Sequence, residues 1–522
     1  MSWMVAPIMF GGYGNGDAGT VYPNSPSMLN CRNTEKGGVE EIDGYGNFIT
    51  GLSALSGSGA GFLSPATLVG MYEYNYSGID TYIRQGQIFV YQRKASTPFV
   101  RWELGAVKSD WNLFNMGAMD GDLGPSGTAA IRFNMFMNNI LATYSIPYAG
   151  SGMVYHDVLL SAGYFAPLSA CPINPAFTEV HYNRVFAGGD WTKKSTINWS
   201  DVDTIHTWAG TSTLNVNTDD GDFGTGIKSY AGDLYFFKSK YSYKISGNDF
   251  NVTSGNYYVT KLEGVPGAVC QGAICVAGGN MYWVSQSHVV EWNGSSFQYI
   301  DYPYLKLDID ATTYNYGTTE AEPFLLVSNE KNNEIIFTKR DTAIWWTYNY
   351  VTRKWAKISL TDSSLVATSI LQHLDITNGK VNPAFCSPTG QNHLFNDSRT
   401  FLNSTGTAIG INSYYETDWM DLGNEKRKDG TRIILEMKKD GLLSAHAYAL
   451  SCSTYYDYDP VAYSSNVITV DGGNYNQFYD IYPQVQTHRR IKLKFANNVI
   501  DTKMQINRAM IEYNLVDESG RL

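Results

Sequence analysis

Few of the side chains that could do chemistry stand at the spacing of a known active site. No G-x-S-x-G elbow, H-E-x-x-H pair or P-loop sequence occurs in the 522 residues. Gly14, Gly16 and Gly19 fit the spacing of a dinucleotide-binding loop. Pro23 and Pro26 follow, however, and would interrupt the helix that such a loop requires. We therefore predict no catalytic residue, no cofactor-binding residue and no cofactor, although a Ser/His/Asp triad stays open because its members can lie far apart along a chain.

The acidic and histidine residues give a similar result for metals. The loop at residues 218–223 contains three aspartates that could surround a calcium ion. It lacks the later bidentate glutamate of a helix-loop-helix site, so a polar loop is the favoured interpretation. His181 and His288 lie in strand-like patterns and His206 in a loop, none with the spacing of a metal ligand. We predict structural histidines and no metal site.

The cysteines are spread through the chain without C-x-x-C spacing. This pattern favours buried free thiols over a disulfide framework or a structural zinc site. The six residues are Cys31, Cys171, Cys270, Cys275, Cys386 and Cys452.

Aromatic and basic runs offer two kinds of binding surface. The aromatic runs at residues 345–350 and 455–458 could stack on sugar rings. They could also anchor a core or a subunit interface, which we favour, because Tyr and Trp are enriched there. The basic runs at residues 426–428 and 488–494 could meet DNA or an acidic protein. The alternation at residues 490–495 also fits an ordinary strand with one wet face, the favoured interpretation.

Composition points to an all-β chain. Glycine (50) and tyrosine (38) are abundant and charged residues make up only 17%, which favours short strands and tight turns over charge-laced helices. The net charge of −11 argues against a protein that mainly grips nucleic acid. Residues 1–10 lack the basic region of a signal peptide, and no run of 18 apolar residues indicates a membrane span.

Short β-rich runs separated by turns recur along the middle of the chain. In residues 280–295, two runs flank a tight turn and the second ends in Asn293-Gly294, a hairpin signal. Repeats of this length with a hairpin core predict a β-propeller of about five to seven blades. The expected units lie near residues 87–144, 153–200, 226–262, 269–301, 324–360 and 365–402.

Changes in composition and strand pattern along the chain predict three segments. Residues 1–70 are rich in Gly, Ser, Asn and Pro and are expected to form an irregular N-terminal arm. Residues 71–410 are the expected propeller. Residues 411–522 have longer alternating strands and more charge, which predicts an antiparallel β-sandwich.

The order of motifs in residues 179–301 resembles the propeller of the tail nozzle proteins of short-tailed bacteriophages, also called tubular, hub or stabilisation proteins. The strand at residues 180–189 ends in Gly-Gly, and Trp199-Ser200-Asp201, the acidic glycine loop at 222–227 and the runs at 234–237 and 282–285 follow it. The segment at 418–423 and the strands after it look like the closing sandwich of the same proteins.

The resemblance implies a non-enzymatic structural protein of the virion tail. Such a protein forms a ring, commonly a homohexamer, below the portal and its adaptor, and carries tail fibres or spikes. DNA would pass through the lumen during ejection without specific binding, and the ring would assemble in the host cytoplasm. The alternatives are a receptor-binding or glycan-binding tail appendage and a propeller glycosidase with paired carboxylates facing the central channel.

Overall fold

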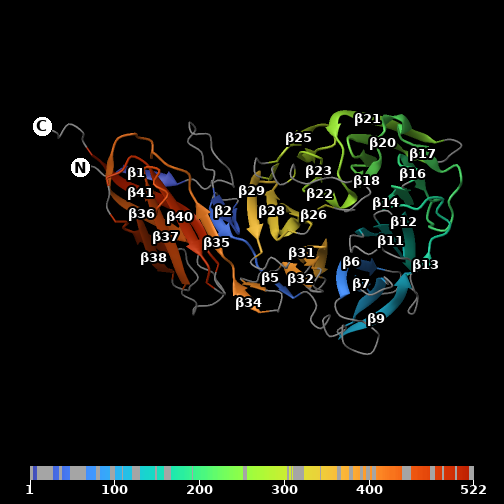
Figure 1. The fold of residues 1–522 in the computed structure, drawn as a ribbon, viewed down its shortest axis with the longest axis horizontal. Helices are drawn as coiled ribbons and strands as arrows, with labels where there is room; N and C mark the ends of the chain where they lie inside the picture. Colours follow the sequence, from blue (N-terminus) through green and yellow to red (C-terminus); the bar gives the residue numbers. More distant parts are fainter. Residues whose placement is uncertain are drawn as a thin grey trace.

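The structure is a computed structural model in which two all-β bodies lie side by side, a propeller and a sandwich (Figure 1). Both termini lie at the sandwich end. Within the described residues, no helix has the length and apolar character to cross a membrane. The described residues are 4–8, 27–34, 38–47, 66–77, 83–93, 100–108, 110–119, 130–146, 150–157, 166–190, 192–250, 255–301, 305, 306, 309, 323–340, 342–360, 366–375, 380–387, 392–395, 400–402, 407–437, 448–470, 477–484, 487–499 and 503–516.

The described strands between residues 45 and 395 form seven four-stranded antiparallel sheets, which are the blades. The first blade is β6 (Ala66–Ser77), β7 (Ile83–Arg93), β8 (Val100–Lys108) and β9 (Asp110–Met119). The second is β10 (Ala130–Phe136), β11 (Asn139–Ile146), β12 (Gly150–Asp157) and β13 (Ala166–Pro167). The third is β14 (Phe177–His181), β15 (Arg184–Gly188), β16 (Thr196–Trp199) and β17 (Thr213–Asn215).

The remaining blades repeat this plan. The fourth is β18 (Gly224–Tyr230), β19 (Asp233–Lys238), β20 (Tyr241–Asp249) and β21 (Asn256–Pro266). The fifth is β22 (Ile274–Ala277), β23 (Asn280–Val284), β24 (Val289–Trp292) and β25 (Phe297–Tyr299). The sixth is β26 (Phe324–Asn329), β27 (Glu334–Lys339), β28 (Ile344–Asn349) and β29 (Lys354–Ser359). Short 3₁₀ helices lie at η2 (Thr218–Asp220), η3 (Gln271–Ala273) and η4 (Glu330–Asn332).

The seventh blade closes the ring with a strand from the other end of the chain. It contains β30 (Ser369–Asp375), β31 (Lys380–Cys386), β32 (Asn392–Phe395) and, as its outermost strand, β5 (Tyr45–Asn47). The inner strands β6, β10, β14, β18, β22, β26 and β30 contact one another in that order, and β30 contacts β6. The propeller is therefore closed, and β5 fastens its last blade.

The sandwich consists of two sheets over one core. The six-stranded sheet contains β3 (Cys31–Asn33), β4 (Val39–Glu41), β41 (Gln505–Leu515), β36 (Lys428–Met437) and β39 (Gln477–Ile481), with β1 (Met4–Ile8) also paired to β41. The five-stranded sheet contains β2 (Ser27–Leu29), β35 (Ser413–Glu416), β40 (Ile491–Asn497), β37 (Tyr448–Tyr456) and β38 (Ser464–Val470). A hairpin of β33 (Thr400–Leu402) and β34 (Ala408–Gly410) precedes them.

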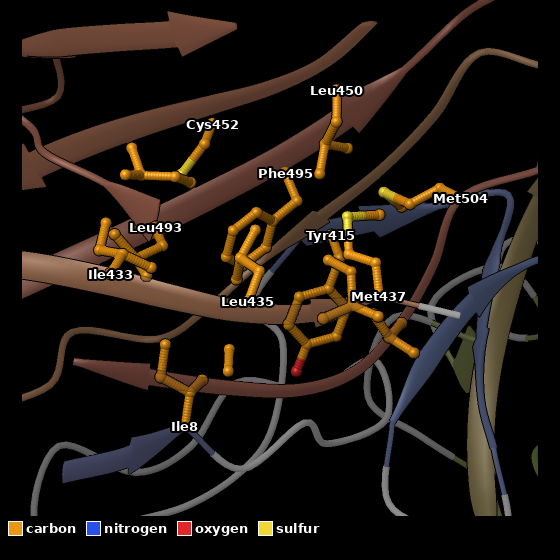
Figure 2. Packing of buried hydrophobic residues seen from close by; sticks show 14 of the residues in the cluster. Ile8, Tyr415, Ile433, Leu435, Met437, Leu450, Cys452, Leu493, Phe495 and Met504 are labelled. Atoms are coloured by element: carbon orange, nitrogen blue, oxygen red, sulfur yellow. The ribbon is translucent and has the colours of Figure 1, made fainter. Parts of the chain in front are cut away.

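Binary patterning explains both cores. On β40, Ile491, Leu493 and Phe495 are buried while the residues between them are partly exposed, as expected of a strand with one wet face. Figure 2 shows Leu493 and Phe495 packed against Ile433 and Leu435 of the facing sheet. Strand β23 of the fifth blade is instead buried on both faces, so it has no alternation after Asn280.

The predicted fold class, an all-β propeller followed by an antiparallel sandwich, is confirmed. The structure differs from the sequence prediction in the first 70 residues. Strands β1 to β4 belong to the sandwich and β5 to the seventh blade, instead of an irregular arm. Each has only three to five residues, too few for a visible period of two. The glycine runs at 11–16 and 57–61 lie outside the described residues.

Candidate functional site

The strand pair at residues 177–188 forms the first two strands of the third blade. Tyr182 and Asn183 form its turn with φ values of 44° and 53°, the left-handed pair of a type I′ hairpin. His181 is buried, with Nδ1 at 2.8 Å from the Ser229 hydroxyl on the next blade. Burial lowers the pKa of His181, which favours the neutral ring. Arg184 donates to the Ser200 carbonyl at 2.8 Å. His181 and Arg184 are strand residues, as the sequence predicts. The single strand expected over residues 180–189 is divided, because the left-handed turn at Tyr182 and Asn183 separates β14 from β15.

The centre of the propeller contains a cavity of about 230 Å³. Its described lining comes from the inner edges of blades two to seven and includes Arg132, Glu179, Lys228 and Gln271. Lys228 Nζ lies 3.1 Å from Glu179 Oε1, and the Ser229 N–H also reaches that oxygen at 3.3 Å. Glu179 is the one carboxylate in this described lining. Glycoside hydrolysis normally needs two, so these residues do not form that site.

The Asp220 and Asp222 carboxylates of the acidic loop at residues 218–223 already accept hydrogen bonds from other groups of the protein. Asp220 accepts hydrogen bonds from Lys238 Nζ at 2.8 and 2.7 Å and from the Tyr243 hydroxyl at 3.0 Å. Burial alone would raise the pKa of Asp220, but the hydrogen bond from Lys238 and those from its other partners lower it. Asp222 accepts hydrogen bonds from the Lys240 N–H at 2.8 Å and from the Ser239 hydroxyl. The side chain of Asp219 lies outside the description, and no cluster among the described acidic, His and Cys residues could hold a metal.

The other two histidines considered in the sequence, His288 and His206, lie apart from each other. His288 stacks on Tyr299 with ring centroids 4.0 Å apart, and its Nδ1 lies 3.1 Å from Asp301 Oδ1. His206 is exposed and makes an edge contact with Tyr155. All six cysteines are free thiols, five of them buried.

The two aromatic runs separate into core and surface residues. Trp345, Trp346 and Tyr348 are buried between blades, so they cannot stack on a ligand. Tyr455 is partly exposed, and Tyr458 is 56% exposed, on the sandwich. The first run is therefore a core element, and the second keeps two accessible rings.

Two cations of the basic runs, Lys428 and Lys492, are also bound by protein groups. Lys428 is buried, and its Nζ donates to the carbonyls of Asn424, Lys426 and Arg489. Burial lowers the pKa of Lys428. Lys492 Nζ lies 2.6 Å from Glu416 Oε1. These contacts remove Lys428 and Lys492 from any row of cations that could neutralise DNA phosphates.

A polar cluster that the sequence did not predict joins the propeller to the sandwich. Asp43 is its centre, between sandwich strand β4 and propeller strand β5. Its carboxylate lies 3.2 Å from Arg32 Nη2, 2.9 Å from Lys503 Nζ and 3.6 Å from Lys331 Nζ. Burial alone would raise the pKa of Asp43, but the charges of Arg32, Lys503 and Lys331 outweigh it and hold the pKa far below its usual range. Arg32 and Lys503 come from the sandwich, Lys331 from blade six.

We call this cluster around Asp43 the junction. Two buried glutamates, Glu41 and Glu334, flank it. Glu334, at the start of β27, lies 3.7 Å from Arg32 Nη1. Burial raises the pKa of Glu334 to about 7 despite the opposing charge of Arg32. Glu41 accepts hydrogen bonds from the Ser413 hydroxyl at 2.5 Å and from Asn497 Nδ2 at 3.1 Å, and burial raises its pKa to about 7. The adjoining cavity measures only about 20 Å³, room for about one water.

Neither the protein-family models nor the curated proteins contain a match to this chain. Solved structures with a similar arrangement include a chain of the mitotic checkpoint complex, at 10% identity and TM-score 0.39, covering 60% of this chain and 84% of that one. The WD40 domain of Toxoplasma gondii coronin has 9% identity and TM-score 0.36, covering 63% and 88%. The BP39L lectin of Burkholderia pseudomallei has 13% identity and TM-score 0.40, covering 67% and 98%. Similarity at this level does not bear on function.

Proposed function

We propose that the chain is a structural subunit of a bacteriophage tail nozzle. In this role, copies form a ring below the portal and adaptor, carry fibres or spikes, and enclose the lumen through which DNA is ejected. The resemblance of residues 179–301 to nozzle propellers motivates the proposal. The protein would act in the virion tail, without catalysis.

The observation that carries the proposal is the junction, because it makes one stiff body from two domains. Asp43 binds cations from both the sandwich and the propeller within 4 Å. Asn30, between two sandwich strands, also makes paired hydrogen bonds to the backbone of Ser359 in blade six. Removing one partner of a buried ion pair costs about 3–5 kcal/mol, so separating the two domains at this joint is costly. A ring that withstands DNA passage requires such stiffness.

DNA would pass between copies and not through one propeller. The central cavity of about 230 Å³ is far too small to hold a segment of DNA duplex. The net charge of −11 suits a lumen that DNA slides past, because binding to DNA depends on cations that neutralise phosphates.

The test is the mass of the purified full chain and its behaviour with portal and adaptor. We expect a closed ring, commonly of six copies, or ring formation on the adaptor. A chain that remains a monomer alone and in the presence of portal and adaptor would contradict the proposal.

A glycan-binding tail appendage is the second candidate, favoured by the accessible Tyr455 and Tyr458. A glycan array with Tyr458→Ala as the loss-of-binding variant distinguishes it from the nozzle. Trp345→Ala is unsuitable as a probe because Trp345 is fully buried. A propeller glycosidase is the weaker alternative, since the described lining of the central cavity provides a single carboxylate.

A further inference from the structure

The outer faces of the two sandwich sheets differ from each other in a way that bears on assembly. We call them the five-strand face and the six-strand face, after their sheets. In each sheet, alternate residues fill the core and the residues between them face outward. The two outward sets lie on opposite sides of the sandwich, so they cannot meet within one copy.

The five-strand face combines aromatic rings with cations. Its members are Tyr414 and Glu416 of β35, Tyr455 of β37, Lys492 and Lys494 of β40, and the adjacent Trp419, Tyr458 and Arg490.

Contacts between cations and aromatic side chains connect these members into one surface. Lys492 Nζ lies 4.6 Å from the Tyr455 ring centroid and 5.2 Å from that of Trp419. Lys494 Nζ lies 4.2 Å from the Tyr414 centroid. Tyr, Trp and Arg are the residue types that most often anchor protein interfaces.

The six-strand face combines apolar side chains with an excess of carboxylates over cations. Its members are Val5 of β1, Arg432, Ile434 and Glu436 of β36, Phe478 and Asp480 of β39, Arg508, Met510 and Glu512 of β41, and the adjacent Tyr482.

Exposure marks this face as unusual for a surface in water. Phe478 is 64% exposed, Tyr482 66% and Val5 54%. Arg432 is already bound to Asp480 at 2.8 Å and to Glu512 at 2.9 Å. Exposed apolar groups gathered on one face and rimmed by charges mark an interaction surface.

The charges of the two faces are complementary. The five-strand face has three cations, Arg490, Lys492 and Lys494, and one carboxylate, Glu416. At its rim, Asp457 accepts the N–H groups of Arg489 and Arg490. The six-strand face has three carboxylates, Glu436, Asp480 and Glu512, and two cations, Arg432 and Arg508.

We propose that the five-strand face of one copy binds the six-strand face of the next copy. This inference rests on the proposed function, because a closed ring of identical subunits requires two different, complementary surfaces on each copy. The sandwich provides such a pair on its opposite sides, with opposite net charge and exposed aromatic residues on both. The sandwiches then form the continuous band of the ring, and the propellers project from it.

The test uses two variants of the full chain, each with one damaged face. Tyr458→Ala with Lys494→Glu damages the five-strand face. Phe478→Ala with Tyr482→Ala damages the six-strand face. We expect each variant alone to lose the ring, with association weakened by about 30-fold or more, as is typical of hot-spot aromatic residues.

Mixing the two variants gives the decisive result. Each retains one intact face, so an equimolar mixture should give a one-to-one dimer that grows no further by mass measurement. Tyr258→Ala and Lys261→Glu on the propeller are matched controls, because Tyr258 is 70% exposed and Lys261 Nζ lies 4.2 Å from the Tyr241 ring centroid. These controls should still form rings.

The outcomes separate the inference from the proposed function. If the unmodified chain forms rings and the two variants form them equally well, the face-to-face contact is wrong while the nozzle role stands. If the unmodified chain never forms rings, alone or with portal and adaptor, both are overturned, and binding of an acidic polysaccharide such as alginate would then assign the five-strand face to a glycan. Unchanged melting temperatures of both variants exclude misfolding as the cause of a lost ring.

Discussion

The side chain of Asn30 pairs with the backbone of Ser359 as a neighbouring strand would. Its Oδ1 accepts the Ser359 N–H at 2.8 Å, and its Nδ2 donates to the Ser359 carbonyl at 3.2 Å and to the Asn412 carbonyl at 2.8 Å. Asn30 has a φ of 52°, in the left-handed region that Asn tolerates better than most residues. One side chain thus connects the sandwich, blade six and the linker between the domains.

Asn30→Ala should destabilise the chain by about 2 kcal/mol or more, because it leaves at least two backbone groups without partners. Urea unfolding measures the loss. Asn498→Ala, at an exposed sandwich position, is the control and should change stability by less than about 0.5 kcal/mol. Equal effects of the two substitutions would argue against the joint.

Asp43→Asn should lower the free energy of unfolding by about 3 kcal/mol or more, because Arg32, Lys331 and Lys503 lose their shared carboxylate. The exposed Asp203→Asn is the control. Limited proteolysis at residues 43–45 should also accelerate, since the joint opens. If Asp43→Asn unfolds at the same denaturant concentration as the parent, the cluster does not hold the domains.

Glu41→Gln should stabilise the chain at high pH and have little effect at low pH. The folded pKa of Glu41 is raised to about 7 from an ordinary value near 4.3, so the folded state favours the protonated carboxyl. The stability that this gives is present below about pH 4 and is lost as pH rises through 7. The gain from Gln should approach about 3 kcal/mol at pH 8.5. A pH-independent difference between Glu41→Gln and the parent would contradict this account.

His393 should make the opposite contribution. It is buried beside Tyr45 and Phe385, and neither ring nitrogen has a hydrogen-bond partner among the described residues. Burial lowers the pKa of His393 to about 4, below the ordinary value near 6.5. Stability is therefore complete above pH 6.5 and falls as pH drops toward 4, by about 3 kcal/mol.

His393→Phe should remove this part of the pH dependence. Unfolding curves of the variant and the parent at pH 7 and pH 4.5 provide the measurement. The difference between the two proteins should shift in favour of the variant at pH 4.5. A constant difference across that range would mean that His393 does not titrate on unfolding.

Trp345→Ala should cost about 3–5 kcal/mol, the usual effect of removing a large buried aromatic side chain. Trp345 packs edge-on against Phe385 at 4.7 Å between centroids and is fully buried. Tyr458→Ala should change stability by less than about 0.5 kcal/mol, because that ring is on the surface. Thermal unfolding of both compares them directly, and a small loss for Trp345→Ala would contradict its core role.

The hairpins of the blades could be predicted because their signal is local. Strands β23 and β24 lie where the sequence predicts a hairpin. The turn at Tyr182 and Asn183 was not predicted, since neither residue is a typical turn glycine and apolar residues lie on both sides of it. The runs between residues 87 and 144 were predicted to form one blade but belong to two. Four short strands in sequence do not reveal which neighbours share a sheet.

The junction could not be predicted because its contacts are remote in sequence. Lys503 and Asp43 are 460 positions apart, and Asn30 and Ser359 are 329 apart. Strand β5 has three residues, so its pairing with β32 depends on the closed ring and not on a local pattern. The sequence showed the aromatic run at 455–458, but only the sheet pairing placed Tyr455 beside Lys492.

Imaging of the virion tail tests the central claim most directly. The account predicts a ring of copies of this chain below the portal and adaptor, with sandwiches in the continuous band and a lumen between the copies. A particle without this chain, or one that carries it as single copies at the tail periphery, would contradict the account.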